Sequence, residues 1–298
     1  MNKTVIKKRW PLYLVLSIIL TVLLVPLYLF GEGGKGEITS LAQLINRYDS
    51  ARCQECHPEI YTQWEKSHHA RPLMGLDDWI FMSKYLKEGP LAIKSPKVAT
   101  LANFPCAKCH LPQLLKTNDT VAAELAVAVL KDDKKLVRKL NIGCLVCHQD
   151  KAVVHGRPDK KALYGNQEFS GHPDRLETVK RSPLLKNALF CGQCHGLGPN
   201  LEFETPVQCA TLYGSYLHAY IPSGGTQTCQ ECHMPNRDHT CLPNFNNRTE
   251  TSARLKAALP MEVQTLGYVF QPKDNLFIPT VVVKTKISNK AGHRIPDG

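Results

Sequence analysis

The chain begins with an unusually long apolar stretch. Residues 12–30 contain no charged side chain, and residues 1–9 contain four basic and no acidic ones. At about 1.5 Å of helical rise per residue, such a run nearly spans a hydrocarbon core of roughly 30 Å. Basic residues before an apolar segment stay in the cytoplasm. We therefore expect a flank and transmembrane anchor over residues 1–30, with the rest of the chain outside the cytoplasm.

A glycine-rich linker follows over residues 31–37, and then shorter amphipathic segments begin. Apolar residues recur at helical spacing from residue 38 to residue 48, and Pro58 is well placed to open a helix that runs towards residue 70. Residues 77–88 and 119–140 are also expected to be helical, the second most strongly. Proline and glycine predict loops over residues 90–105 and 196–208.

The pattern changes near the C-terminal end. Residues 276–288 are rich in β-branched side chains, which is typical of a strand. No second strand is evident to pair with it, so we expect pairing with another subunit, or a chain that continues beyond residue 298. The expected domains are a main body over residues 38–262 and a β-rich tail over residues 263–298. The expected fold class is mainly α with long loops.

Composition excludes two classes of protein and leaves the charge ambiguous. With 298 residues and 43% hydrophobic side chains, the chain is neither intrinsically disordered nor a small disulfide-stapled protein. The formal net charge is +11 and the isoelectric point is near 9.1. Taken alone, this charge indicates a nucleic acid or an acidic membrane surface as partner.

The cysteines change this picture, because ten of the 12 occur in five C-x-x-C-H segments. Two cysteines three residues apart form thioethers to the two vinyl groups of one haem, and the adjacent histidine then binds the iron as proximal ligand. The motifs predict five covalently attached haems c. Their attachment cysteines are Cys53, Cys56, Cys106, Cys109, Cys144, Cys147, Cys191, Cys194, Cys229 and Cys232, and their proximal histidines are His57, His110, His148, His195 and His233.

Other uses of C-x-x-C explain this pattern poorly. Zinc ribbons pair one C-x-x-C with another and have no need of a histidine after each second cysteine. A thioredoxin-type site needs one such motif. Disulfides between residues three apart would close only short loops and add little stability. The two cysteines left over, Cys209 and Cys241, are expected to pair as a disulfide in an oxidising compartment, with iron ligation by one of them as the alternative.

Enough histidines remain to supply a second ligand to every iron. Seven lie outside the motifs: His68, His69, His155, His172, His218, His239 and His293. Methionine is scarce, with five residues in the whole chain, so bis-histidine ligation is expected. Only one of the adjacent His68 and His69 is expected to bind iron, because consecutive helical residues point about 100° apart. Haems closed by two histidines are low-spin and suit electron transfer rather than substrate chemistry.

Haem attachment also changes the meaning of the charge. Four of the excess positive charges lie in residues 1–9. Each ferric haem c carries roughly −1 through its propionates, so five haems leave a net charge of roughly +2 on the exported part. The charge therefore no longer indicates a nucleic acid partner.

The motifs resemble those of a known family. The segment C-Q-E-C-H-P-E-I-Y-T-Q-W-E-K-S-H-H-A, from Cys53 to Ala70, resembles C-x-x-C-H followed by Y-x-x-W-x-x-S-x-H-A in the multihaem cytochromes c related to the tetrahaem cytochrome of ammonia oxidisers and to hydroxylamine oxidoreductase, the cytochrome c-552/4-like group. Here it would be a membrane-anchored pentahaem member. The resemblance implies a multihaem cytochrome c fold and favours His69 over His68 as a distal ligand.

The same resemblance bears on three further distal ligands. His155 follows the third motif as in C-x-x-C-H-G-P-G-S-x-H, although the G-P-G-S part is absent here. His239 follows C-H-M-P, and His293 lies in a G-H-x-x-P-x-G element that precedes a β-domain in larger relatives. Together with His172, which precedes the fourth motif, the expected distal set is His69, His155, His172, His239 and His293, with His218 next.

We expect an electron carrier anchored in the inner membrane, with its haem domain in the periplasm. Its partners would be redox proteins, namely a quinol-oxidising membrane subunit or periplasmic and outer-membrane cytochromes, and the C-terminal strand suggests a hetero-oligomer. The alternative is an oxidoreductase with one open haem that acts on nitrite, hydroxylamine or a sulfur oxyanion, so enzymatic activity stays undecided. Two observations count against it: the family's nitrite-acting enzymes use C-x-x-C-K, which is absent here, and histidines suffice to close every iron.

Overall fold

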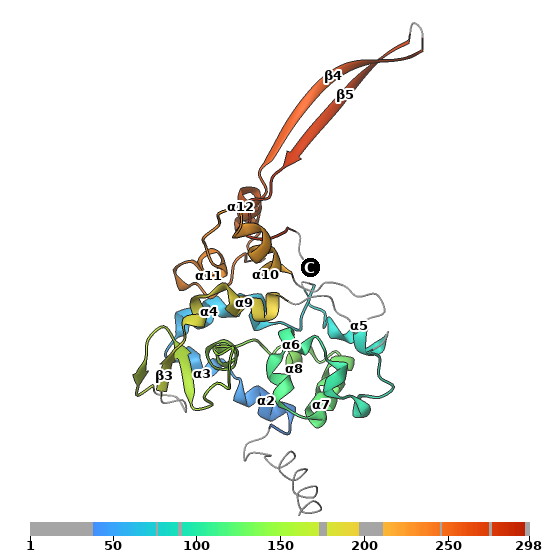
Figure 1. Cartoon of the computed structure of the whole chain (residues 1–298). Helices are drawn as coiled ribbons and strands as arrows, with labels where there is room; N and C mark the ends of the chain where they lie inside the picture. Colours follow the sequence, from blue (N-terminus) through green and yellow to red (C-terminus); the bar gives the residue numbers. More distant parts are fainter. Residues whose placement is uncertain are drawn as a thin grey trace, which may run out of the picture. The chain divides into compact units, whose positions relative to one another are not determined.

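A computed structural model describes residues 38–75, 77–88, 91–172, 178–196, 211–244, 246–273 and 276–295 (Figure 1). The chain divides into two units, Met1–Ile38 and Thr39–Gly298. The described part of the second unit is built from short helices, one small sheet and one long hairpin.

The best-packed part of this unit is helical and lies between residues 41 and 152. Helix α7 (Asp119–Leu130) packs against α2 (Leu41–Arg47), α5 (Met82–Lys87) and the 3₁₀ turn η2 (Pro96–Val98). It turns Val121, Leu125 and Val129 into the interior, where they are fully buried. The other elements of this part are α3 (Ala51–Gln54), α4 (Pro58–Glu65), η1 (His68–Ala70), η3 (Leu101–Asn103), α6 (Ala107–His110), η4 (Pro112–Lys116), α8 (Lys134–Val137) and the π-helical turn η5 (Val146–Asp150).

Two expected helices are shorter than predicted. The helix expected over residues 119–140 breaks after Leu130, because Asp132 adopts a left-handed conformation (φ 54°) and the Asp133 side chain caps α8 by accepting from the Leu136 amide. The helix expected over residues 77–88 begins only at Met82. Before it, Asp78 also has a positive φ of 59° and the chain folds back through a bridge between Met74 and Ile80.

A three-stranded sheet that the hydrophobic pattern did not predict follows η5. Its order is β1-β3-β2, with β1 (Ala162–Gly165) parallel to β3 (Thr178–Arg181) and β2 (Phe169–Ser170) antiparallel to it. These strands are two to four residues long, too short to show a clear alternation of polar and apolar positions.

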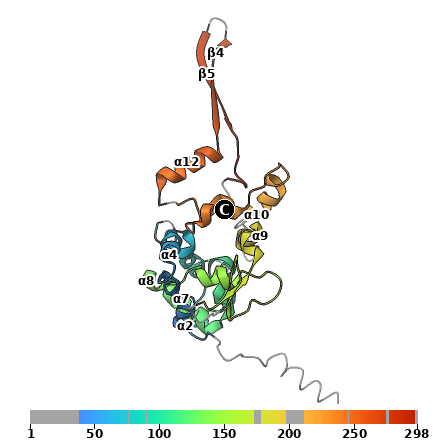
Figure 2. The same ribbon diagram turned by 90° about the vertical axis from the view of Figure 1, so that its left-hand side faces the viewer.

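The second half of the unit has few buried apolar side chains. It contains η6 (Pro183–Lys186), α9 (Ala188–His195), α10 (Leu212–Ser215), the π-helical η7 (Tyr216–Tyr220), α11 (Cys229–His233), η8 (Pro235–Arg237) and α12 (Arg248–Ala258). Helices α9 and α10 lie against each other, as Figure 2 shows. Among the described residues of α10, η7, α11 and α12, none is a buried apolar side chain.

The C-terminal strand does have a partner within the chain. Strand β5 (Leu276–Ile287) pairs antiparallel with β4 (Met261–Lys273), from Met261 opposite Ile287 to Lys273 opposite Leu276, as the long hairpin in Figure 1 shows. The expectation of an unpaired strand was therefore wrong. The sequence hides β4, because polar Gln264 and Thr265 and the flexible Gly267 interrupt its apolar pattern.

The expected fold class was also wrong. The described residues form a mixed fold of short helices and strands rather than a mainly helical one with a single-stranded tail. Within the described ranges, every helix is too short or too polar to cross a bilayer. The apolar segment over residues 12–30, where a transmembrane helix was expected, lies outside these ranges.

Candidate functional site

Each C-x-x-C-H motif coincides with a helical turn. The fourth and fifth motifs lie in α9 and α11, and the second lies at α6. The third runs into η5, and the first ends at His57, the residue that precedes α4. A helical turn brings residues three and four apart to the same face, so each motif presents both sulfurs and its histidine together.

Three motif histidines face a second histidine from elsewhere in the chain. The ring of His195 lies 6.2 Å from that of His69, measured between centroids, and His148 lies 6.3 Å from His239. The rings of His233 and His293 are 6.0 Å apart. The planes of the first pair are nearly perpendicular, at 80°, whereas those of the other two pairs are nearly parallel, at 24° and 20°.

These spacings fit a single iron between each two rings. A metal–nitrogen bond to imidazole is about 2.0 Å, so two rings on opposite sides of one metal have centres roughly 6 Å apart. One member of each pair belongs to a C-x-x-C-H motif, whose thiols would attach the porphyrin beside it. The residues present therefore fit haem c at the third, fourth and fifth motifs.

Hydrogen bonds orient most of these imidazoles for metal binding. The Nδ1 atoms of His110 and His148 lie 2.8 Å from the Pro72 carbonyl and 2.9 Å from the Tyr164 carbonyl, and Nδ1 of His233 contacts the Leu242 carbonyl. A carbonyl only accepts, so Nδ1 must donate and the lone pair lies on Nε2.

Two of the distal histidines are held in the same way. His239 Nδ1 donates to the Arg237 carbonyl at 2.7 Å, and His293 Nδ1 donates to the Arg294 carbonyl at 2.8 Å. In both, the nitrogen left with a lone pair is again Nε2.

Burial favours the neutral form of four of the paired histidines. Desolvation, together with the nearby His195, lowers the pKa of His69 to about 4. Burial likewise lowers the pKa of His148, His195 and His233 below the usual value. A neutral imidazole is the form that binds a metal.

Side chains of helix α4 contact the two segments that carry the distal histidines His69 and His239. Trp64 Nε1 donates to the Ile142 carbonyl at 3.0 Å, and the Ile142 amide in turn donates to the His69 carbonyl at 2.8 Å. On the same helix, Gln63 Oε1 accepts from the His239 amide at 3.1 Å. The roles of Gln63 and Ile142 were not predicted, because these contacts join residues 73 to 176 positions apart.

The other expected ligands are not brought into such pairs. His57 and His110 have no imidazole in ring contact within the described part of the chain; the ring of His110 contacts that of Phe81, with centroids 4.8 Å apart. His218 is exposed on η7, and His172 lies near Phe169, with centroids 6.4 Å apart. Their ligand roles stay predictions.

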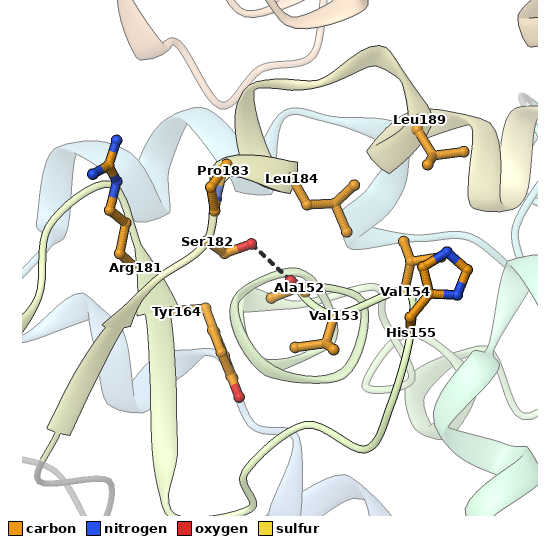
Figure 3. Close-up of a pocket in the computed structure, with 10 residues that line it drawn as sticks. All are labelled: Ala152, Val153, Val154, His155, Tyr164, Arg181, Ser182, Pro183, Leu184 and Leu189. Atoms are coloured by element: carbon orange, nitrogen blue, oxygen red, sulfur yellow. Dashed lines mark hydrogen bonds between the residues drawn. The ribbon is translucent and has the colours of Figure 1, made fainter.

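His155 is exposed and borders a pocket of about 380 Å³ (Figure 3). The pocket is mostly apolar, with Val154, Leu184 and Leu189 among its lining residues and Arg181 at its edge. Ser182 Oγ donates to the Ala152 carbonyl at 2.7 Å and so ties its two sides together. The ligand role of His155 also stays a prediction.

Attachment cysteines of different motifs touch one another. A hydrogen bond with Cys53 lowers the pKa of the Cys144 thiol to about 7, and one with Cys109 does the same for Cys194. A hydrogen bond with Cys229 raises the pKa of Cys191. The first motif therefore adjoins the third, and the fourth adjoins both the second and the fifth.

A tyrosine against the fourth motif was not predicted from the sequence. A Cβ atom added at Gly192 would lie 2.6 Å from ring carbons of Tyr213. Tyr213 stacks on Tyr216 and Tyr216 on Tyr220, with centroids 6.1 and 5.6 Å apart. The glycine inside the motif was the available signal, since close approach is one reason for a glycine in a helix.

The expected disulfide between the two remaining cysteines involves a residue outside the described part of the chain. Cys209 lies outside the described residues. Cys241 has a positive φ of 52°, and its burial raises the pKa of its thiol to about 11. The disulfide between them stays a prediction.

Comparison with known proteins gives a match to a family over part of the chain. Residues 52–149, about a third of the chain, match the family described as cytochrome c554 and c-prime. No curated protein and no solved structure matches the chain. The matched segment contains the first three motifs and His69, and it supports a multihaem c-type cytochrome that carries covalently bound haem c and takes part in electron transfer.

Proposed function

We propose that the chain binds five haems c and relays electrons between the cytoplasmic membrane and acceptors outside the cytoplasm. Haem iron supplies the redox chemistry, because it cycles between the ferric and ferrous states. The chain supplies attachment through ten cysteines and proximal ligation through five histidines. The distal set that we propose begins with His69, His239 and His293, and includes His155, His172 and His218 as candidates for the other irons.

The three facing histidine pairs carry this proposal. Two imidazoles on one iron leave no coordination position for a substrate, so these sites favour electron transfer over catalysis. Each distal histidine comes from a segment distant from the motif it faces: His69 lies 126 positions before His195, and His239 lies 91 positions after His148. All three pairs, at 6.0–6.3 Å, place a motif histidine against a histidine from outside the motifs.

Contacts between attachment cysteines support an order for the relay. The contacts Cys53–Cys144, Cys109–Cys194 and Cys191–Cys229 join motifs one and three, two and four, and four and five. The Cys147 thiol also lies close enough to Cys191 and Cys194 to affect their titration, and this proximity connects motif three to motif four. The fourth motif is therefore the branch point that we propose.

The cellular location and the partners are proposals drawn from the sequence. Haem c attachment and the apolar run at residues 12–30 both favour a haem domain at the outer face of the cytoplasmic membrane. Redox proteins there, such as a quinol-oxidising subunit or soluble cytochromes, are the proposed partners. Fractionation of cells that express the chain, with detection of haem by peroxidase staining, tests the location.

Haem content and iron spin state test the proposal directly. A pyridine haemochrome assay on the purified holoprotein should give five haems per chain, and electron paramagnetic resonance of the oxidised protein should give low-spin signals. Two nearly parallel ligand pairs predict rhombic signals, and the perpendicular His69–His195 pair predicts a strongly anisotropic one. Fewer than five haems, or mostly high-spin iron, would contradict the proposal.

One observation favours an alternative. The ring of His110 contacts that of Phe81, and no second imidazole is in ring contact with it within the described residues, which suits an iron with an open position at the second motif. The alternative is an oxidoreductase acting on nitrite, hydroxylamine or a sulfur oxyanion. A stoichiometric high-spin signal that shifts when one of these compounds is added, with turnover, would support it.

A further inference from the structure

Glutamine side chains inside the fourth and fifth motifs reach across to the neighbouring motif. In motif four, Gln193 Nε2 donates to the carbonyl of Lys151, just after motif three, at 2.9 Å. In motif five, Gln230 Nε2 donates to the carbonyls of Asn187 and Leu185, just before motif four, at 2.8 and 3.2 Å. Each glutamine lies between two attachment cysteines, so its bond joins one haem-attachment turn to the next.

The bonds of Gln230 fix the orientation of its amide. Both carbonyls can only accept, so the nitrogen of the amide, and not its oxygen, must face them. The oxygen, Oε1, is buried and has no hydrogen-bond partner in the part of the chain that the structure describes. A buried acceptor without a partner costs free energy, and the two donated bonds offset that cost. The two carbonyls therefore select a hydrogen-bond donor at position 230.

Apolar packing holds motif three, whereas motifs four and five have little of it. The two residues between the cysteines of motif three, Leu145 and Val146, are buried. In α9, which carries motif four, the buried residue is Ala188, and α11, which carries motif five, has none. Helices α9 and α11 nevertheless contact each other (Figure 1). The glutamine hydrogen bonds supply directional contacts there that side-chain packing supplies in motif three.

We propose that Gln193 and Gln230 are positioning residues that set the spacing between the haems of motifs three and four and of motifs four and five. This inference rests on the proposed attachment of haem c at these motifs. The thiols of Cys191 and Cys229 already share a hydrogen bond, and Gln230 directly follows Cys229. A bond beside an attachment sulfur limits how far two haems can separate, and the rate of a reaction depends steeply on the placement of the reacting groups.

Motif one provides a matched control, because it has the same sequence as motif five, C-Q-E-C-H. Gln54 occupies in motif one the position that Gln230 occupies in motif five. Its side chain is exposed and makes no hydrogen bond with the described residues. Gln54→Glu and Gln230→Glu therefore introduce the same charge at the same place in a motif, but only Gln230→Glu turns an acceptor towards two carbonyls.

Pulsed electron paramagnetic resonance of the oxidised holoprotein measures the spacing, because a neighbouring ferric haem accelerates relaxation in a strongly distance-dependent way. The strongly anisotropic signal expected from the His69–His195 pair of motif four is the reporter. Its relaxation should slow in Gln193→Glu and Gln230→Glu, with five haems still attached, and stay unchanged in Gln54→Glu. Freeze-quench reduction should show transfer between haems four and five slowed about threefold or more in Gln230→Glu alone of the motif-one and motif-five variants.

A neutral variant separates the hydrogen bonds from the charge. Gln230→Met is similar in length and cannot donate, so it should slow relaxation and transfer as Gln230→Glu does. Equal relaxation and rates in the Gln230 and Gln54 variants overturn the positioning role. Loss of a haem from both Gln230 variants also overturns it, because Gln230 would then serve attachment itself. Fewer than five haems in the wild type contradicts instead the proposed function, and a pyridine haemochrome assay distinguishes these outcomes.

Discussion

Histidine placement depends on a few backbone contacts that are individually weak. His148 and His233 each donate Nδ1–H to a backbone carbonyl, of Tyr164 and Leu242, which leaves Nε2 to bind iron. The position of His69 depends instead on its own carbonyl, which accepts from the Ile142 amide, and on the bond from Trp64 to Ile142. The C-x-x-C-H pattern identified the proximal residues because their chemistry is local. The distal partners are defined only where segments far apart meet.

The neighbouring histidines His68 and His69 offer a matched test. His69→Ala should leave five haems attached but make one of them five-coordinate, and the strongly anisotropic low-spin signal of the perpendicular pair should disappear. His68→Ala should retain that signal. Electron paramagnetic resonance with a pyridine haemochrome assay measures both variants, and loss of the signal from the His68 variant alone would reverse the assignment.

The contact between Gly192 and Tyr213 makes a second test. Gly192→Ala should lower haem occupancy at the fourth motif, because the added methyl would lie 2.6 Å from the tyrosine ring and push the motif away from it. Gly214→Ala is the control, since it adds the same helix-favouring methyl where no atom of the described chain lies within 4 Å. Mass spectrometry of the tryptic haem peptides measures occupancy; equal occupancy in both variants would exclude a role for this contact.

Helices of this chain are short, and their ends are set by capping more than by hydrophobic pattern. Asn118 caps α7 by accepting from the Thr120 and Val121 amides at 3.1 and 3.3 Å, and Thr228 and Glu231 form a capping box on the fifth motif. The pattern predicted the helix over residues 119–140 but missed its break at Asp132, because a left-handed residue followed by a capping aspartate leaves the apolar periodicity nearly unchanged.

Removal of the α7 cap should be measurable. Asn118→Ala should destabilise the holoprotein by about 1 kcal/mol, because two amides at the start of α7 lose their acceptor. Asn118→Asp should be close to neutral, since aspartate caps equally well and its charge is favourable at a helix N-terminus. Urea unfolding followed by far-ultraviolet circular dichroism gives both values, and equal midpoints for wild type and the alanine variant would contradict the assigned cap.

Buried apolar residues are distributed unevenly through the second unit. Most lie between residues 41 and 152, whereas beyond residue 178 few described side chains other than Val179, Ala188 and Leu242 are buried and apolar. The fourth and fifth motifs belong to this sparsely packed half, so the proposed haems would supply much of the apolar material there. The hairpin adds a separate apolar surface that the described part of its own chain leaves exposed.

The proposed branch point at the fourth motif predicts which substitutions slow electron transfer to the fifth haem. Replacing Cys191 and Cys194 by alanine removes one haem between motif five and motifs one and three, so reduction of the fifth haem should slow by an order of magnitude or more. Replacing Cys106 and Cys109 removes a haem on a side branch and should leave that rate nearly unchanged. Stopped-flow reduction measures both rates. Equal rates in the two variants would rule out this order.

Local chemistry and tertiary contact decide different properties of this protein. The spacing of cysteines and histidines is enough to predict covalent haem and the proximal ligands, because thioether formation and proximal ligation involve residues at most four apart. The pairing of His195 with His69, of His148 with His239 and of His233 with His293 depends on contacts across 60 to 126 positions, which no local pattern encodes. The partner of β5 could not be identified from the sequence for the same reason. Strands pair through backbone groups that nearly every residue carries, so the pairing leaves little trace in the side chains.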